Sequence, residues 1–283
     1  MNLRWMRRKL ARWVPERLKA RYRARLFGYG APPPGAAGSV READGHLVVS
    51  FAGIELRVPA AAADDVRYHF VENADSVEEI GGLVRAARET GGVLLDVGAM
   101  RGLFAAAWIL ARPGNRAVAL EPSPAFARDL EALGELNGLG ERLHTVSAAA
   151  GRAPGTVRAG TDASGLIDFA PPPGAETFDA AVTSLDAECA RLGPPDAVKV
   201  DVEGDELEVL LGGAGLLESR RPLLFLELHL DLLERRGTAV DEIVRLLARH
   251  GYRFETSAGE PLPASAVARS PKTVLRVVAR AGG

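Results

Sequence analysis

An acid and two glycines lie close together at one turn of the sequence. The run Val93–Val97 is apolar except for Asp96, and Gly98 and Gly102 follow it before another apolar segment begins. This order predicts a buried strand that turns sharply into a helix. Glycine lets a ligand approach the backbone closely, and the free N–H groups at a helix N-terminus attract negatively charged groups. We therefore expect a ligand to bind at Asp96, Gly98, Ala99 and Gly102.

The spacing of this turn distinguishes between two classes of nucleoside ligand. A dinucleotide site has the pattern G-x-G-x-x-G, whereas this turn has D-x-G-x-x-x-G, with the acid inside the motif. A carboxylate there suits a cationic ligand, so the spacing favours S-adenosylmethionine over a nicotinamide dinucleotide. Glu121 and Pro122 end the next apolar run, where a carboxylate can hold ribose hydroxyls. Both classes use that acid, so Glu121 indicates a nucleoside without choosing between them.

Further polar residues lie at the ends of later apolar runs. Ligands of open α/β sheets bind outside the carboxyl ends of the strands, and the sequence places Ser147, Asp201, Glu203 and His229 there. We expect Ser147 to contact the cofactor and the other three residues to be catalytic. His229 is the histidine best placed to act as a general base, with Asp201 as the alternative. Because Lys199 alternates with both acids, an ion-paired structural cluster is the competing interpretation.

A divalent metal is a weaker hypothesis for the same residues. Asp201, Glu203, Glu227 and His229 combine carboxylates with one imidazole, a set that suits Mg²⁺ or Mn²⁺. No spacing in the sequence enforces such a site, so a metal is not favoured and no metal ligand is assigned.

The elements that position these residues alternate from residue 93 onward. Strand patterns over 93–97, 117–121, 143–148, 197–202 and 223–229 are separated by helical patterns, with the clearest helices expected at 103–112, 124–136 and 240–250. Such alternation predicts a parallel sheet with helices on both faces. Two last strands, 252–256 and 273–279, are expected as an antiparallel pair. The sequence thus predicts an α/β fold, a Rossmann-like, mostly parallel seven-stranded sheet of the class I methyltransferase type.

Composition divides the rest of the chain into segments. Residues 1–30 read as a basic amphipathic helical leader, 31–38 as a Pro/Gly linker, and 39–92 as a small β meander plus a helix packed on the main domain, 93–283. The meander strands are expected at 46–51 and 54–58, and the helix at 65–90. Residues 151–183 interrupt the alternation, so we expect short strands and a loop over the ligand site.

Charge is distributed unevenly along the chain. Residues 1–25 hold ten Lys and Arg against one Glu, a net charge of +9, and since the whole chain carries −2 the remainder carries −11. A basic leader on an acidic body predicts binding of residues 1–26 to an anionic membrane surface or a protein partner, or packing on its own domain. Nucleic acid is not expected, because no nucleic-acid motif accompanies the leader. The single cysteine favours a cytoplasmic protein, which the leader would hold at the inner membrane surface if it binds lipid.

The combination of these motifs resembles a known family. Over about residues 60–256 the chain is similar to the FkbM-type methyltransferases, in the segments Asp96-Val97-Gly98-Ala99-Met100-Arg101-Gly102, Glu121-Pro122, Thr183-Ser184-Leu185-Asp186, Val198-Lys199-Val200-Asp201-Val202-Glu203-Gly204, Glu208 to Ala214 and Leu226-Glu227-Leu228-His229. The resemblance implies that Asp96, Gly98 and Gly102 line the methionine side of the donor and that Glu121 holds its ribose. Met100 and Arg101 stand where the family pattern usually has Asn and a hydrophobic residue.

The resemblance also implies the activity. An S-adenosylmethionine-dependent O-methyltransferase is expected, which methylates a hydroxyl of a sugar, a glycolipid or a secondary metabolite. Its partner would be a small-molecule or glycan acceptor. The alternative is a non-catalytic methyltransferase-like binding protein that the basic leader tethers to a membrane or an assembly.

Overall fold

The computed structural model describes residues 35–161, 167–169 and 177–282. The predicted basic leader lies outside the described residues, as do residues 31–34 of the predicted linker. Among the helices of the described part, none is long and apolar enough to cross a membrane.

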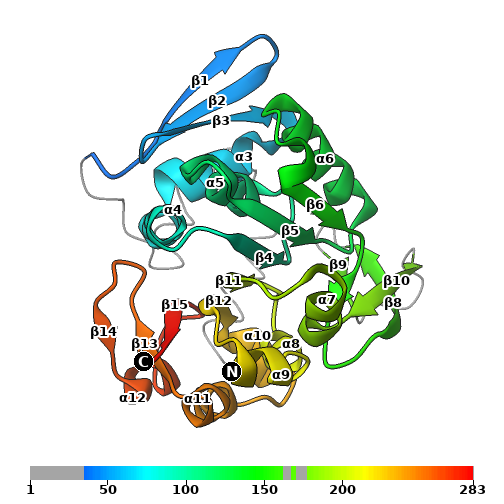
Figure 1. Ribbon diagram of the computed structural model, residues 1–283, viewed down its shortest axis with the longest axis vertical. Coiled ribbons are helices and arrows are strands. Elements are labelled where there is room, and N and C mark those ends of the chain that lie inside the picture. Colours follow the sequence, from blue (N-terminus) through cyan, green and yellow to red (C-terminus); the bar gives the residue numbers. More distant parts are fainter. Residues whose placement is uncertain (1–34, 162–166, 170–176, 283) are drawn as a thin grey trace, which may run out of the picture.

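The main sheet is mostly parallel and forms the centre of the molecule (Figure 1). Its spatial order is β14 (Pro261–Leu262), β13 (Tyr252–Glu255), β15 (Val274–Ala281), β12 (Leu223–His229), β11 (Ala197–Val200), β4 (Val93–Val97), β5 (Arg116–Leu120) and β6 (Leu143–Val146). The strands from β12 to β6 run parallel, and β15 pairs antiparallel with both β12 and β13. This confirms the predicted class I methyltransferase topology. The eighth strand, β14, is a two-residue addition that pairs with β13.

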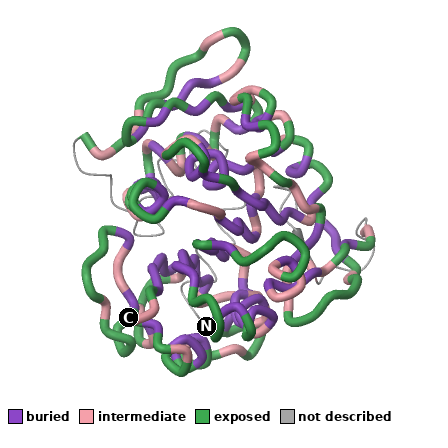
Figure 2. The backbone as a smooth tube through the Cα atoms, in the orientation of Figure 1, coloured by how far each residue is buried: buried purple, intermediate pink, exposed green. Residues whose placement is uncertain are grey.

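Helices cover both faces of this sheet because its strands are apolar on both sides. Leu94 belongs to one buried cluster, with residues of α4 (Ala74–Glu89), α5 (Leu103–Ala111) and α6 (Pro124–Leu136). Leu95 belongs to the opposite cluster, with residues of α7 (Leu185–Leu192), α8 (Glu206–Leu211), α9 (Ala214–Ser219), α10 (Leu230–Arg235), α11 (Val240–Arg249) and α12 (Ala264–Ala268). Successive residues of a strand point to opposite faces, so the central strands β4, β11 and β12 are buried along nearly their whole length, whereas the edge strand β6 is partly exposed (Figure 2).

A three-stranded antiparallel meander precedes the main sheet. It consists of β1 (Ser39–Ala43), β2 (His46–Phe51) and β3 (Ile54–Pro59), so β1 adds a strand to the two predicted. Leu56 and Val58 of β3 are fully buried and join the cluster of α5 and α6. The meander therefore lies over the helices of one face, away from the main sheet (Figure 1).

The helix predicted over 65–90 is broken into several elements. The short helices η1 (Ala60–Ala62), α3 (Ala63–Arg67) and η2 (Tyr68–Glu72), the last a π-helix, precede α4. Asn73 separates these short helices from α4. Its backbone is extended, and its side chain accepts a hydrogen bond from the Ser76 N–H at 3.0 Å. An Asn in that role caps a new helix rather than continuing the old one. The break places residues 65–69 at the edge of the cavity described below.

Residues between β6 and α7 form a second, small sheet. A short 3₁₀ helix, η3 (Gly140–Arg142), leads into β6, and the small sheet then has the order β7 (Ala149–Ala150), β10 (Thr177–Thr183), β8 (Gly155–Thr161) and β9 (Ile167–Asp168). The predicted short strands are therefore present. Figure 1 shows this sheet beyond β6, at the edge of the main sheet.

Candidate functional site

The turn after β4 brings two strand ends into contact. Gly98 has φ +79°, and a Cβ at this position would come within 1.9 Å of the Asp201 carbonyl oxygen beyond β11. Gly102, with φ +78°, begins α5, and a Cβ there would lie 2.9 Å from Leu130 Cγ of α6. Any side chain other than hydrogen would force these segments apart. The two glycines thus set the spacing of β4, β11 and α6 at the carboxyl edge of the sheet.

Two buried carboxylates face this turn. Asp96 Oδ2 accepts a hydrogen bond from the Ala105 N–H in the first turn of α5, at 3.1 Å. Glu121 Oε2 accepts from the Met100 N–H at 2.8 Å, and Oε1 accepts from the Ser123 N–H at 2.7 Å. Burial raises the pKa of Asp96 to about 6 and that of Glu121 to about 7. A ligand with positive charge or with hydroxyl donors would favour the ionised form of both groups.

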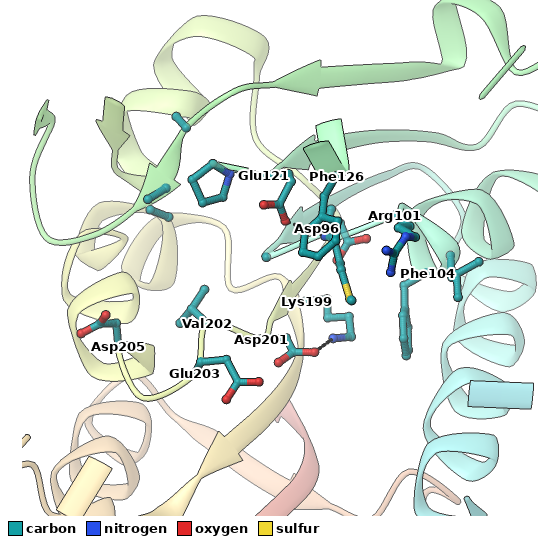
Figure 3. Close-up of a pocket in the computed structure, with 18 of the residues that line it drawn as sticks. Asp96, Arg101, Phe104, Glu121, Phe126, Lys199, Asp201, Val202, Glu203 and Asp205 are labelled. Atoms are coloured by element: carbon teal, nitrogen blue, oxygen red, sulfur yellow. Dashed lines mark hydrogen bonds and ion pairs between the residues drawn. The ribbon is translucent and has the colours of Figure 1, made fainter. Parts of the chain in front are cut away.

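These groups open into one cavity, which Figure 3 shows. Its wall contains the predicted cofactor residues Asp96, Gly98, Ala99, Glu121 and Pro122 and the predicted catalytic residues Asp201 and Glu203, whereas Gly102 is not part of it. The other lining residues are Asp65, His69, Met100, Arg101, Leu103, Phe104, Phe126, Ala148, Ala149, Ala150, Phe169, Lys199, Val202 and Asp205. In the view of Figure 3, Asp96 and Glu121 lie on one side of the cavity and Asp201 and Glu203 on the other. The structure therefore brings together the exits of β4, β5 and β11, as the sequence predicts.

Lys199 anchors the opposite wall. Its side chain is almost completely buried, and Nζ lies 2.8 Å from Asp201 Oδ2 and 4.3 Å from the centre of the Phe104 ring. Burial opposes the ionisation of Asp201, but Lys199 and His229 together lower its pKa below the usual range. Asp201 is therefore a carboxylate held in a fixed position on the cavity wall. The predicted ion pair between Lys199 and Asp201 exists, and Lys199, Asp201 and Glu203 all line the cavity.

The structure does not place His229 on the cavity wall. Its Nδ1 lies 2.8 Å from Glu206 Oε1, and its Nε2 lies 3.5 Å from Glu203 Oε2 and 3.9 Å from Asp201 Oδ1. Burial lowers the pKa of His229, but the hydrogen bond to Glu206 and the neighbouring carboxylates outweigh it and raise the pKa to about 10. The imidazole therefore lies behind Asp201 and Glu203 and does not face the cavity directly. This geometry argues against His229 as the proton acceptor.

Ser147 also lies elsewhere than predicted. It is exposed and is not part of the cavity wall, where the following residues Ala148–Ala150 lie instead. The reason is the length of β6, which ends at Val146, so that the chain bends at Ser147 before β7 begins. The predicted cofactor contact at Ser147 is thus replaced by small apolar residues.

Two residues on the cavity wall, Arg101 and His69, are not among the site residues predicted from the sequence. Arg101 is held by an ion pair with Asp65 and by a hydrogen bond from Nε to Asp129 Oδ2 at 2.8 Å, and its guanidinium stacks over Phe126 at 4.6 Å. Both partners are distant in sequence, so local patterns give no signal for them.

His69 lines the cavity from the helical segment before the main sheet. Its ring packs edge-on against Phe104 at 5.3 Å, and Nδ1 lies 2.7 Å from Ser76 Oγ. Burial, Arg276 and Lys199 lower its pKa to about 3, so the ring is neutral at neutral pH. In the continuous helix predicted over 65–90, His69 is an ordinary mid-helix residue with no sign of a site. The helix instead breaks at Asn73, and the segment before the break lines the cavity.

Comparison with known proteins identifies the family. A model of the methyltransferase FkbM domain matches residues 96–254, more than half of the 283 residues. Among solved structures, a methyltransferase FkbM from Methylobacillus flagellatus KT is 19% identical with a TM-score of 0.44, and the match covers 66% of this chain and 42% of that one. A methyltransferase from Agrobacterium tumefaciens, described as SAM dependent, is 12% identical with a TM-score of 0.44, and the match covers 88% and 74%.

The match to the Methylobacillus protein spans less than half of that protein's length. A search of the curated proteins found no match. The family model begins at Asp96 and extends through β11 and β12 to β13, so it contains the glycine turn and all three strand exits, of β4, β5 and β11, that bear acids on the cavity wall. The chain therefore belongs to the FkbM family of methyltransferases.

Proposed function

We propose that the protein is an S-adenosylmethionine-dependent O-methyltransferase that acts on a hydroxyl of a sugar, a glycolipid or a secondary metabolite. The observation that carries the donor assignment is the pair of buried carboxylates, Asp96 and Glu121, at the exits of adjacent strands on either side of the glycine turn. The membership of the family supports methyl transfer as the reaction. The acceptor class follows from the resemblance in the motifs and is the part that the experiment below addresses.

The donor side of the cavity suits a cationic nucleoside. Each oxygen of Glu121 accepts one backbone N–H and retains a lone pair, so the carboxylate can still accept from both ribose hydroxyls. Asp96 offers negative charge beside the turn at Gly98, where the backbone is open to close approach. S-adenosylmethionine bound there would supply an activated methyl group on its sulfonium. The residues of this chain would hold it by charge and hydrogen bonds and exclude water from the methyl carbon.

The acceptor side has a residue suited to receive the hydroxyl proton. His69 is neutral and lies on the cavity wall. In the tautomer whose Nδ1–H donates to Ser76 Oγ, Nε2 carries the lone pair. Its pKa of about 3 makes it a weak base, so it would take the proton only as the acceptor oxygen becomes positively charged on methylation. Asp201, held by Lys199, is the other wall residue that can do so. We therefore assign the role of proton acceptor to His69 in place of His229, with Asp201 as the alternative.

Replacing His69 by Gln should slow turnover without changing donor affinity. A positioned general base contributes about a hundredfold or more to the rate, so we expect kcat to fall by about that factor while the donor Kd stays within twofold. Single-turnover methyl transfer and calorimetry measure the two quantities. His144→Gln, an exposed histidine on β6, is the control and should behave like wild type. Unchanged turnover in His69→Gln would move the role to Asp201.

Donor affinity should depend on pH through Glu121. Its pKa in the free protein is about 7, so at pH 6 most of it is protonated, and binding of a cationic donor must release that proton. Donor affinity therefore rises as pH increases, by roughly tenfold between pH 6 and 7.5 for one released proton. Calorimetry in two buffers of different ionisation enthalpy measures the release directly. Proton uptake on donor binding, or equal donor affinity at pH 6 and pH 7.5, would contradict the assignment of Glu121 as the donor contact.

Methyl transfer itself is tested with S-adenosylmethionine labelled in its methyl group and a panel of hydroxylated glycans, glycolipids and metabolites. Label in an ether-linked methyl group of one acceptor class would support the proposal and name the substrate. Donor binding with no transfer to any member of the panel would favour the non-catalytic binding role.

A further inference from the structure

A group of carboxylates surrounds the inner edge of His229. Asp201 and Glu203 follow β11, Glu227 lies in β12, and each has an oxygen within 4 Å of His229 Nε2. One ligand atom from each of Asp201, Glu227 and His229 lies within 4.8 Å of the others. From this arrangement we propose that the protein binds one divalent cation between His229 Nε2 and the carboxylates of Asp201, Glu203 and Glu227.

The distances favour a shared cation over direct hydrogen bonds. Nε2 lies 3.5 Å from Glu203 Oε2, 3.9 Å from Asp201 Oδ1 and 3.9 Å from Glu227 Oε1. These separations are longer than a charged N–H···O hydrogen bond, which is about 2.7–2.9 Å. Two ligands of one Mg²⁺ or Mn²⁺ at about 2.1 Å each are roughly 3–4 Å apart. The three oxygens therefore lie where a common ion, rather than the ring N–H, would bring them.

The imidazole is oriented as a metal ligand. Its Nδ1 lies 2.8 Å from Glu206 Oε1, and Glu206 is fully buried. Metal-bound histidines usually donate their other N–H to a carboxylate, which fixes the tautomer and directs the remaining lone pair at the ion. With Nδ1–H donated to Glu206, a cation that displaces the Nε2 proton would be bound by the Nε2 lone pair, on the side of Asp201, Glu203 and Glu227.

Two of the carboxylates are also held in position by cationic side chains. Lys199 occupies Asp201 Oδ2 at 2.8 Å and leaves Oδ1 toward His229. Arg276 donates to Glu227 Oε1 at 2.6 Å, and Glu79 binds the same guanidinium at 2.9 Å. The Glu227 side chain is only 8% exposed, and its other oxygen, Oε2, is buried with no hydrogen-bond partner among the described residues. A cation at this cluster would supply a partner for that oxygen.

The chemistry of the ligands indicates which ions would bind. Carboxylate oxygens suit Mg²⁺ and Mn²⁺, and one imidazole shifts the preference toward Mn²⁺. Because Asp201 and Glu203 line the cavity, the ion would be reached from the acceptor side, where it could bind an acceptor oxygen (Figure 3). This last role rests on the proposed function, whereas the cation site itself does not.

The test is titration of metal-free full-length protein with MnCl₂, with free Mn²⁺ followed by its electron paramagnetic resonance signal. We expect one bound Mn²⁺ per chain and displacement by Mg²⁺. His229→Gln and Glu203→Gln should each weaken Mn²⁺ binding at least about tenfold, and His144→Gln should leave it unchanged. Glu203 is 46% exposed, so that variant should fold even if His229→Gln does not.

Two outcomes would overturn the cation site. One is no bound Mn²⁺ up to about 1 mM, the weak end of protein cation sites. The other is binding that is equal in wild type and Glu203→Gln. These readouts do not involve the methyl donor, so Mn²⁺ binding without donor binding would leave the cation site standing and refute the proposed function. Donor binding and methyl transfer by a protein that binds no Mn²⁺ up to about 1 mM would do the reverse.

Discussion

Glu121→Ala is expected to weaken binding of S-adenosylmethionine by roughly a hundredfold. The change removes both hydrogen bonds to the ribose, and hydrogen bonds to a charged group contribute about 1.5–3 kcal/mol each, so a loss of about 3 kcal/mol is a conservative figure. Calorimetric titration of the variant measures it. The residue also accepts from the backbone N–H groups of Met100 and Ser123, so thermal unfolding must be recorded in parallel.

Two companion variants separate binding from folding. Glu121→Gln keeps the side-chain volume and one acceptor oxygen, and should weaken the donor by a smaller factor with less loss of stability. Glu131→Ala removes an exposed acid from α6 and should change neither quantity. If Glu121→Ala folds and binds the donor as wild type does, the nucleoside is not held at the exit of β5.

Gly98→Ala is expected to be the most damaging single substitution at the turn. The residue has φ +79°, which costs an L-residue about 1–2 kcal/mol, and its Cβ would approach the Asp201 carbonyl oxygen to 1.9 Å. Separating β4 from β11 to relieve that contact adds a cost of about 1–3 kcal/mol. We expect a loss of roughly 3 kcal/mol in the free energy of unfolding, measured by urea denaturation, and no measurable donor binding.

Gly114→Ala provides a matched control for the backbone term. Gly114 also has a left-handed backbone, with φ +87°, but nothing lies within 4 Å of the position of its Cβ. The control should lose only about 1–2 kcal/mol to conformational strain and should keep donor affinity. Equal stability losses in the two variants would show that the close approach of Gly98 to Asp201 does not matter.

The donor side of the site could be predicted because its determinants are local. A strand, a glycine that must adopt positive φ and a helix start follow one another within a few residues, from Val93 to Gly102. Glu121 repeats the same position on the next strand. Parallel strands bring such exits to one edge of the sheet, so the cavity wall at Asp96, Glu121 and Asp201 follows from the order of elements.

The rest of the site could not be predicted, because its residues come together only through tertiary packing. Arg101 meets Asp65 and Asp129 across large separations in sequence, and His69 reaches the cavity because Asn73 ends one helical segment and starts another. Ser147 lies outside because β6 ends at Val146, two residues earlier than the strand predicted over 143–148. For His229 the predicted strand was right, but the placement of Asp201 and Glu203 between it and the cavity depends on the backbone after β11.

The backbone conformation at Met100 explains why the family pattern usually has Asn at this position. Its φ is +50°, in the left-handed region that Asn tolerates better than Met, and its N–H donates to Glu121 at 2.8 Å. The role visible here belongs to the backbone rather than to the side chain. The substitution of Met for Asn therefore leaves the contact between the turn and Glu121 in place.

The most direct test of the central claim is calorimetric titration of the wild-type protein with S-adenosylmethionine and, separately, with NAD at pH 8, where Glu121 is largely ionised in the free protein. We expect one molecule of S-adenosylmethionine to bind per chain and NAD not to bind. Absence of S-adenosylmethionine binding by the folded protein, or binding of NAD in its place, would contradict it.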